Sequence, residues 1–513
     1  MRSKFLAAVR VLCVFALFTP GILHLVGTTG FITGCITPPT DGTDGTDGTD
    51  GTDGTDGTDG TDGTDGTDGT DGTDGTDGTD GTDGSGTTGD TGLTGKFVGA
   101  KTCSLCHVTI HRNWSATLHA RALESLEGIN QGTNAECLGC HTVGFGQEGG
   151  FKDRATTNSL AGVGCENCHG PGRDHVENIE DESLYPVIDI GADVCGACHT
   201  GSHHPNFEEW QESKHAAVTE ELAQEFFEGT NVNRCGICHS GDAFYSIVLK
   251  TETIEDTALE GIPAEDQNPI TCAICHDPHM QTGNAAEPED GRDYQLRYPE
   301  VAFPTPDNSI NSTTNPDRFN ICGQCHHDRG RDWTSNSRGP HYGHQSNVYV
   351  GEMPMPDGEE DSPLVLSRVS VHSFAREQCA TCHLFRQDFQ DENAPAIAGH
   401  TFTVNEDSCA TAGCHPSTAQ AEAVKTTLAT EIQGRIEEVR ALLGDEALWQ
   451  YSAEGGPPSG DQGDIPESIR KARFLLLYVE HDGSLGIHNP AYVRDMLLEA
   501  KELIEGEANW PPP

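Results

Sequence analysis

The chain has 513 residues, a formal net charge of −51 and only 34% hydrophobic residues, with 20 cysteines and 61 glycines. So large a negative charge excludes a nucleic-acid-binding protein, and the share of hydrophobic residues is low for a conventional hydrophobic core. We expect partners that touch the chain to be basic or bridged by cations.

The N-terminus reads as an export signal. Three basic residues precede an apolar run that ends in small residues, which is typical of a secretory signal peptide over 1–34. Its end, Ile-Thr-Gly-Cys35, resembles the bacterial lipobox, which implies cleavage before Cys35 and acylation of that cysteine. We therefore predict an outer-membrane lipoprotein, on the periplasmic or the cell-surface face. An uncleaved transmembrane anchor is the alternative.

A low-complexity segment follows the predicted anchor. Thr40 to Gly84 is fifteen repeats of Thr-Asp-Gly. Such a sequence has nothing with which to bury a core, so we predict a disordered linker over 35–95, extended by repulsion between its Asp side chains.

Nine Cys-x-x-Cys-His motifs occupy the next 310 or so residues, and we number them 1 to 9 in chain order. In motif 9 four residues separate the cysteines instead of two. The paired cysteines are Cys103 and Cys106, Cys137 and Cys140, Cys165 and Cys168, Cys195 and Cys198, Cys235 and Cys238, Cys272 and Cys275, Cys322 and Cys325, Cys379 and Cys382, and Cys409 and Cys414. The histidines that follow are His107, His141, His169, His199, His239, His276, His326, His383 and His415.

This spacing is the attachment site of c-type haem, whose two vinyl groups bond the thiols while the adjacent imidazole becomes the proximal iron ligand. We therefore predict nine haems c. Zinc binding is the alternative interpretation, but a zinc ribbon needs no histidine after the second thiol. The motifs use eighteen cysteines, and Cys13 and Cys35 remain in the N-terminal segment, so the haem-bearing body has none left for a disulfide.

The motifs follow an internal repeat. Motifs 1 and 4 are each followed by Trp-x4-His-Ala, at Trp114 to His119 and at Trp210 to His215. Two further motifs complete each set of three. The repeat predicts haem modules over 96–193 and 194–300, with a divergent third module over 301–416.

The last segment, 417–513, lacks cysteine and has helical periodicity. Leu428, Ile432 and Ile436 recur at helical spacing, and Gly444 is a suitable stop. A second helix is expected from Pro466, and a third is expected after Asn489 as N-cap with Pro490 in its first turn.

The segments FVGAKTCSLCHVTIHRNWSATLHARAL, ECLGCHTVGFGQEGGF and LAGVGCENCHGPG resemble the multihaem cytochrome c-552/c-554 family, whose relatives include hydroxylamine oxidoreductase and the pentahaem and octahaem nitrite reductases. The resemblance implies a mainly α fold with extensive ordered loops around a core of haems, and electron transfer along them. The C-terminal segment is similar to the helices through which pentahaem nitrite reductases dimerise. A homo-oligomer contact and a cap over the last haems both stay open.

The second axial ligands separate a carrier from an enzyme, because an iron with two protein ligands passes electrons whereas an open position binds substrate. Twelve further histidines are available for nine irons. The resemblance favours His119, His215, His175, His279 and His400. The other candidates are His203, His204, His341, His344, His372 and His111. Arg329 and Arg331, near motif 7, fit either an anion pocket with His341 and His344 or pairing with haem propionates.

Three functions follow. The first is a lipid-anchored carrier with nine mostly bis-His haems, which passes electrons between a membrane donor and a periplasmic or extracellular acceptor in anaerobic respiration, through redox partner proteins. The second is an oxidoreductase acting on nitrite, hydroxylamine or sulfur oxyanions; no catalytic residue is identified for it. The third is a subunit of a conductive cytochrome filament.

Overall fold

The computed structural model describes residues 95–219, 232–255, 258–284, 293–298, 320–356, 369–375, 377–411 and 413–512. The chain divides into two units, Met1–Gly72 and Thr73–Pro513, and all of these residues belong to the second. The predicted signal peptide, Cys35 and the Thr-Asp-Gly repeats lie outside the described residues.

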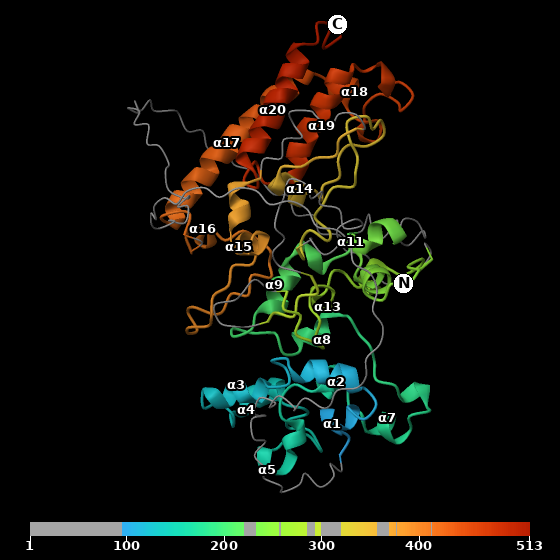
Figure 1. Ribbon diagram of the computed structural model, residues 1–513, viewed down its shortest axis with the longest axis vertical. Coiled ribbons are helices and arrows are strands. Elements are labelled where there is room, and N and C mark those ends of the chain that lie inside the picture. Colours follow the sequence, from blue (N-terminus) through green and yellow to red (C-terminus); the bar gives the residue numbers. More distant parts are fainter. Residues whose placement is uncertain are drawn as a thin grey trace, which may run out of the picture. The chain divides into compact units, whose positions relative to one another are not determined.

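The described residues form helices and loops, and their β-pairing is limited to isolated bridges (Figure 1). This confirms the prediction of a mainly α fold with extensive ordered loops. Within these residues, no helix combines the length and the apolarity that crossing a membrane requires.

The haem-motif region holds many short helices. They are α1 (Ala100–Cys103), α2 (Val108–Ser115), α3 (Ala122–Gly128), α4 (Ala135–His141), α5 (Arg154–Thr157), α6 (Cys165–His169), α7 (Arg173–Glu177), α8 (Ala192–Gly196), α9 (Asn206–Glu212), α11 (Ile237–His239), α12 (Gly241–Ala243), α13 (Cys272–Cys275), α14 (Gln345–Val350), α15 (Cys379–His383) and α16 (Asp407–Thr411). Single 3₁₀ or π turns lie at Asn158–Leu160, Glu182–Leu184, Lys214–Ala216, Val232–Gly236, Phe244–Leu249, Ala264–Asp266 and Val371–Phe374.

The motifs themselves nucleate several of these helices. Motifs 2, 3 and 8 lie whole within α4, α6 and α15. Residues three and four apart share one face of a helix, so a helical turn presents both thiols and the histidine together. Local caps hold the turns: the Asn134 side chain accepts from the Glu136 N–H at 3.1 Å, and Gly170 ends α6 with a φ of 79°.

The C-terminal segment contains the long helices α17 (Thr418–Leu443), α19 (Glu467–Asp482) and α20 (Pro490–Glu505), with α18 (Glu446–Trp449) and 3₁₀ turns at Ser452–Glu454 and Gln462–Asp464 between α17 and α19. The expected ends are confirmed: Gly444 follows α17, and the Asn489 side chain caps α20 by accepting from the Tyr492 N–H at 3.3 Å. The three long helices run side by side (Figure 1).

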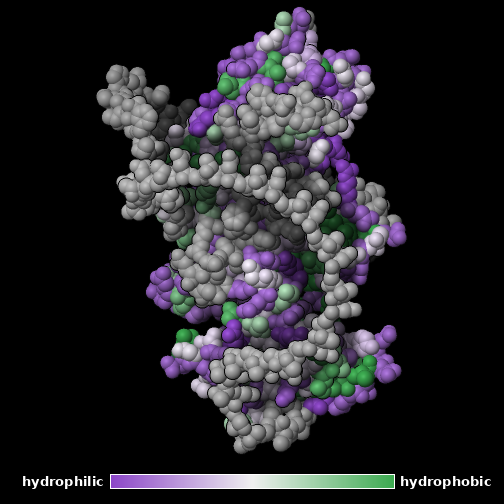
Figure 2. All heavy atoms as spheres, viewed as in Figure 1, coloured by the Kyte–Doolittle hydropathy of each residue, from purple (hydrophilic) through white to green (hydrophobic). Residues whose placement is uncertain are grey.

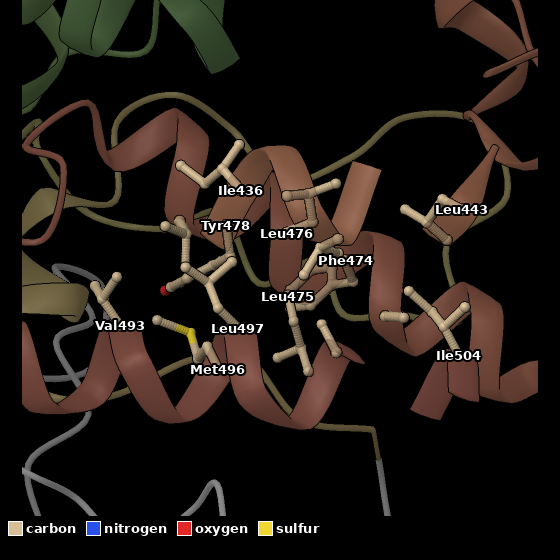
Figure 3. Close-up of a cluster of buried hydrophobic side chains, with 14 of the residues drawn as sticks. Ile436, Leu443, Phe474, Leu475, Leu476, Tyr478, Val493, Met496, Leu497 and Ile504 are labelled. Carbon is tan, nitrogen blue, oxygen red and sulfur yellow. The ribbon is translucent and has the colours of Figure 1, made fainter. Parts of the chain in front are cut away.

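These three helices enclose the largest apolar core among the described residues. Phe474, Leu476, Val493 and Met496 are completely or almost completely buried where the helices meet (Figure 3). Trp333, which comes from the loop after motif 7, joins the same core and is 1% exposed. Burial of this kind is the main source of stability for a helical bundle.

The haem-motif region has much smaller apolar clusters. One gathers Phe97, Leu123 and Leu160 with a few neighbours, and another joins Val232, Ala243 and Leu259. Apolar side chains stay exposed around the motifs, and one face shows hydrophobic residues scattered among hydrophilic ones (Figure 2). The protein alone therefore encloses little core here, as expected where a covalently bound apolar group completes it.

Expressed without haem attachment, the chain should keep its C-terminal helices and lose order around the motifs, because only the former carry a core of their own. Hydrogen–deuterium exchange should find peptides from α17, α19 and α20 protected, and peptides from α1, α4 and α6 unprotected. The fully matured protein is the control. Equal protection of both regions without haem would contradict the prediction.

Candidate functional site

The nine motifs are close neighbours in space. None of their eighteen cysteines forms a disulfide, and particular thiols of different motifs interact. Thiols of two motifs lie within side-chain hydrogen-bond reach at Cys103 and Cys165, Cys140 and Cys198, Cys195 and Cys272, Cys238 and Cys325, and Cys322 and Cys379. Longer-range electrostatic interaction further relates Cys168 to Cys198, Cys275 to Cys325, and Cys382 to Cys409.

These contacts place the motifs in a definite order. Motifs 1, 3, 4, 6, 7, 8 and 9 follow one another, motif 2 branches from motif 4, and motif 5 branches from motif 7. Backbone contacts agree at both branches, since Cys140 Sγ lies 4.0 Å from the Ala197 carbonyl and Cys325 Sγ lies 4.0 Å from that of Ile237. The order differs from the order along the chain.

The histidines test whether haem fits these motifs. A metal–imidazole bond is about 2 Å long, and the ring centre lies about 1.1 Å behind the bonding nitrogen, so two imidazoles on opposite faces of one iron have ring centres about 6.2 Å apart. Seven motif histidines have a second histidine ring at 6.0 to 6.5 Å.

The pairs are His141 with His204, His169 with His279, His199 with His119, His239 with His341, His276 with His400, His326 with His215, and His383 with His488. His204 lies 6.5 Å from His141 and 6.3 Å from His199. Because His119 lies closer to His199, at 6.1 Å, we pair His119 with His199 and His204 with His141. The described residues therefore fit haem at these seven motifs.

Hydrogen bonds orient the imidazole rings of several motif histidines. In His141, His169, His276 and His383, Nδ1 lies 2.6 to 2.9 Å from a backbone carbonyl, which leaves Nε2 for a metal. Burial, the largest cause in each case, lowers the pKa of His199, His215 and His400 to about 4. These rings are therefore neutral at physiological pH, which is the form that binds metals.

Motif 9 has a different partner. Its His415 interacts electrostatically with His372, whose Nδ1 lies 2.7 Å from the Ile487 carbonyl. His372 is thus held by the loop before α20 with its other nitrogen available. Motif 1 stands apart, because no ring contact joins His107 to a second histidine among the described residues.

Four of the candidate ligands face no motif histidine in this part of the chain. His344 uses both nitrogens, on the carbonyls of His341 and Tyr478. His203 contacts Phe389 with ring centres 3.8 Å apart and the rings tilted, and His111 contacts Trp114. His175 lies in α7, where its Nδ1 is buried without a partner.

His488 is the residue that sequence reasoning missed. It stands in the loop between α19 and α20, far along the chain from any motif, yet its ring centre lies 6.3 Å from that of His383. Its Nδ1 lies 2.6 Å from Oδ1 of Asp482. The available sequence signal for His488 was the helix start at Asn489–Pro490, because that start fixes the position of the residue before it.

The repeat is visible in matching contacts. The indole N–H of Trp114 donates to the Val163 carbonyl at 3.1 Å, and that of Trp210 donates to the Ile270 carbonyl at 3.0 Å. Both carbonyls lie two residues before the first cysteine of a third motif. The histidines of the two Trp-x4-His segments then face motif 4 and motif 7, each the first motif of the next set.

Two carboxylates, buried Glu166 and partly exposed Glu209, hold neighbouring loops in place. Glu166, inside motif 3, accepts from the backbone N–H groups of Val98, Gly99 and Gly172 at 2.8 to 3.1 Å, which ties α1 to α7. Glu209 accepts from the N–H groups of Ala398 at 3.0 Å and His400 at 2.7 Å, which fixes the loop that carries His400.

Comparison with known proteins covers part of the chain by sequence. Residues 102–170 match the family described as cytochrome c554 and c-prime. The chain is 40% identical over 92 residues to cytochrome c-554 of Nitrosomonas europaea, which is 15% of this chain and 39% of that protein. It is 25% identical over 212 residues to the C-type polyheme cytochrome OmcB of Geobacter sulfurreducens, 39% of this chain and 26% of OmcB. The chain therefore spans less than half of either relative.

Two solved structures are similar over most of the chain. The outer cell wall cytochrome OcwA has a TM-score of 0.53 and 19% identity, and the likeness covers 80% of this chain and all of OcwA. The undecahaem cytochrome from the S-layer of Carboxydothermus ferrireducens has a TM-score of 0.53 and 20% identity, over 81% of this chain and 70% of the other. At these identities the likeness concerns the fold.

Proposed function

We propose that the chain, which is a multihaem c-type cytochrome, carries nine haems and transfers electrons through a series of mostly bis-His irons between a membrane donor and a periplasmic or extracellular acceptor. One observation carries the proposal: seven motif histidines each face a second histidine at 6.0 to 6.5 Å. That separation matches two imidazoles on one iron.

The order of the motifs supports a path. Thiols within hydrogen-bond reach join motif 1 to motif 3 and motif 4 to motif 6, and electrostatic interactions join motif 3 to motif 4 and motif 6 to motif 7, so groups bonded to these sulfurs would be neighbours. Motifs 2 and 5 lie on side branches and offer further points of entry or exit. Haem iron supplies the one-electron chemistry by cycling between its ferric and ferrous states.

The chain's own residues position and insulate that path. The paired histidines would hold a haem iron from its two faces, and hydrogen bonds from Nδ1 to backbone carbonyls orient rings such as those of His141, His276 and His383. Met ligation raises a haem's potential, whereas the assigned pairs are all histidines, so we expect low to intermediate potentials. We assign His372 to motif 9. We assign His175 to motif 1, because His175 lies in α7 and Glu166 ties α7 to α1, which contains the first cysteine of motif 1.

The location rests on the N-terminal sequence. The lipobox-like Cys35 and the Thr-Asp-Gly repeats favour a lipoprotein whose haem region extends away from an outer membrane. Two structures of similar fold are named for a cell wall and an S-layer, which supports an extracytoplasmic place. The strong negative charge favours redox partners with basic surfaces.

The purified, matured protein should contain nine haems per chain and, once reduced, bind carbon monoxide at no more than one of them, because an iron with two histidines has no open position. A pyridine haemochrome assay counts the haems, and CO difference spectra count the open irons. Two or more CO-binding haems would contradict the carrier and favour the oxidoreductase. Turnover of nitrite, hydroxylamine or tetrathionate would then identify its substrate.

A further inference from the structure

A cation lies between motifs 5 and 7. The Arg329 guanidinium donates to Sγ of Cys238 at 3.4 Å and to the Cys325 carbonyl at 3.0 Å. These two cysteines directly precede the proximal histidines of motifs 5 and 7. The same side chain also donates to the His327 carbonyl at 2.7 Å, so its hydrogen bonds hold the charge in one place.

This positive charge forms no ion pair among the described residues, although the adjacent Asp328 carboxylate interacts with it electrostatically. Among the described residues, no Asp or Glu oxygen lies within ion-pair distance of Arg329. The neighbouring Asp328 instead accepts from the Gly330 N–H at 2.7 Å. Arg329 is only partly exposed, so water screens it weakly and its charge acts on what surrounds it.

A charge of opposite sign lies behind motif 8. Asp482, at the end of α19, is 3% exposed, and its Oδ1 lies 2.6 Å from Nδ1 of His488. Its Oδ2 accepts from the N–H and the hydroxyl of Ser484. Within the described part of the chain, no Lys or Arg forms an ion pair with this carboxylate. A carboxylate behind a ligating imidazole makes that imidazole a stronger donor to its metal.

We propose that Arg329 and Asp482 set a step in reduction potential between neighbouring positions, raising the potentials at motifs 5 and 7 and lowering the potential at motif 8. This rests on the proposed function, since it assumes haem at these motifs and His488 as a ligand. Reduction adds one negative charge, which a nearby cation favours and a nearby anion disfavours.

Motifs 7 and 8 are direct neighbours, so the difference in potential acts on the electron transfer between them. Cys322 of motif 7 and Cys379 of motif 8 touch, and the Asn320 side chain donates to Cys379 Sγ at 3.7 Å. Electrons arriving from motif 8 therefore move downhill to motif 7. The branch at motif 5 shares the stabilising cation, which makes motifs 5 and 7 together the place where electrons collect.

Potentiometric titration of the matured protein, followed by electron paramagnetic resonance of the ferric low-spin signals, tests the step. Arg329→Gln should lower the midpoint potential of the signals from motifs 5 and 7, and Asp482→Asn should raise that of motif 8. The signal of motif 8 is identified by its loss in His488→Ala. Arg329→Lys keeps the charge and should leave the midpoints near those of the parent protein.

Matched controls remove the same charges elsewhere. Arg338→Gln and Asp461→Asn change exposed side chains in neighbouring loops and should shift no midpoint appreciably. Unchanged midpoints in Arg329→Gln and Asp482→Asn, or shifts of the opposite sign, would overturn the step while the carrier function stands. Fewer than nine haems, or no low-spin signal lost in His488→Ala, would instead count against the proposed function itself.

Discussion

Replacing His488 with alanine is expected to add one carbon-monoxide-binding haem per chain to the reduced protein. The His488 ring is the one that faces His383 of motif 8 at 6.3 Å, so its removal leaves that iron with a single axial ligand. Motif 8 lies between motifs 7 and 9, and electron transfer along this part of the path should slow. CO difference spectra and stopped-flow reduction measure the two effects.

His481→Ala is the matched control. His481 also lies at the C-terminal end of α19 and is buried, but its Nδ1 bonds the Pro340 carbonyl at 2.9 Å and its ring stacks on Tyr342. Its loss should cost stability without opening an iron. The assignment of His488 fails if both variants bind carbon monoxide alike, or if neither binds more than the parent protein.

Replacing Glu166 with alanine is expected to free the start of the haem-motif region from motif 3. Three backbone N–H groups would lose a buried carboxylate acceptor, and a hydrogen bond to a charged group contributes about 1.5–3 kcal/mol. We expect local destabilisation of about 3–5 kcal/mol, which is roughly a 100- to 5,000-fold rise in hydrogen exchange at Val98, Gly99 and Gly172.

Hydrogen–deuterium exchange with peptide resolution measures this effect. Glu136→Ala is the control, because Glu136 occupies a similar place beside motif 2 but is exposed and accepts no hydrogen bond to its side chain among the described contacts. Glu166→Gln keeps one acceptor oxygen and should fall between the two. Unchanged exchange in Glu166→Ala would show that α1 and α7 are held by other contacts.

Local structure was readable from the sequence. The motif cysteines and their proximal histidines are predicted from fixed spacing, because one helical turn is enough to present them together. The C-terminal helices follow from apolar periodicity and from caps such as Asn489, and the structure confirms their ends near Gly444 and Pro466. The mainly α fold with ordered loops follows from the shortage of apolar residues relative to the motifs.

Partner choice was readable only in part. The sequence favoured His119, His215, His279 and His400, and each of them faces a motif histidine. His203 and His344 were candidates too, but His203 contacts Phe389 and His344 bonds two carbonyls. The second histidine at each motif comes from a segment distant along the chain, and the packing of loops decides which segment that is. His488 shows this most clearly, since α19 and α20 deliver it to a motif about a hundred residues away in sequence.

The sequence by itself therefore predicts the cofactor class and the attachment residues and determined the mainly helical character of the chain, because each depends on residues within one or two turns of the chain. Only the tertiary structure decided the spatial order of the motifs, the histidine opposite each one, and the places of Arg329 and Asp482. These depend on which loops meet, and that is set by the packing of segments distant along the chain rather than by local spacing.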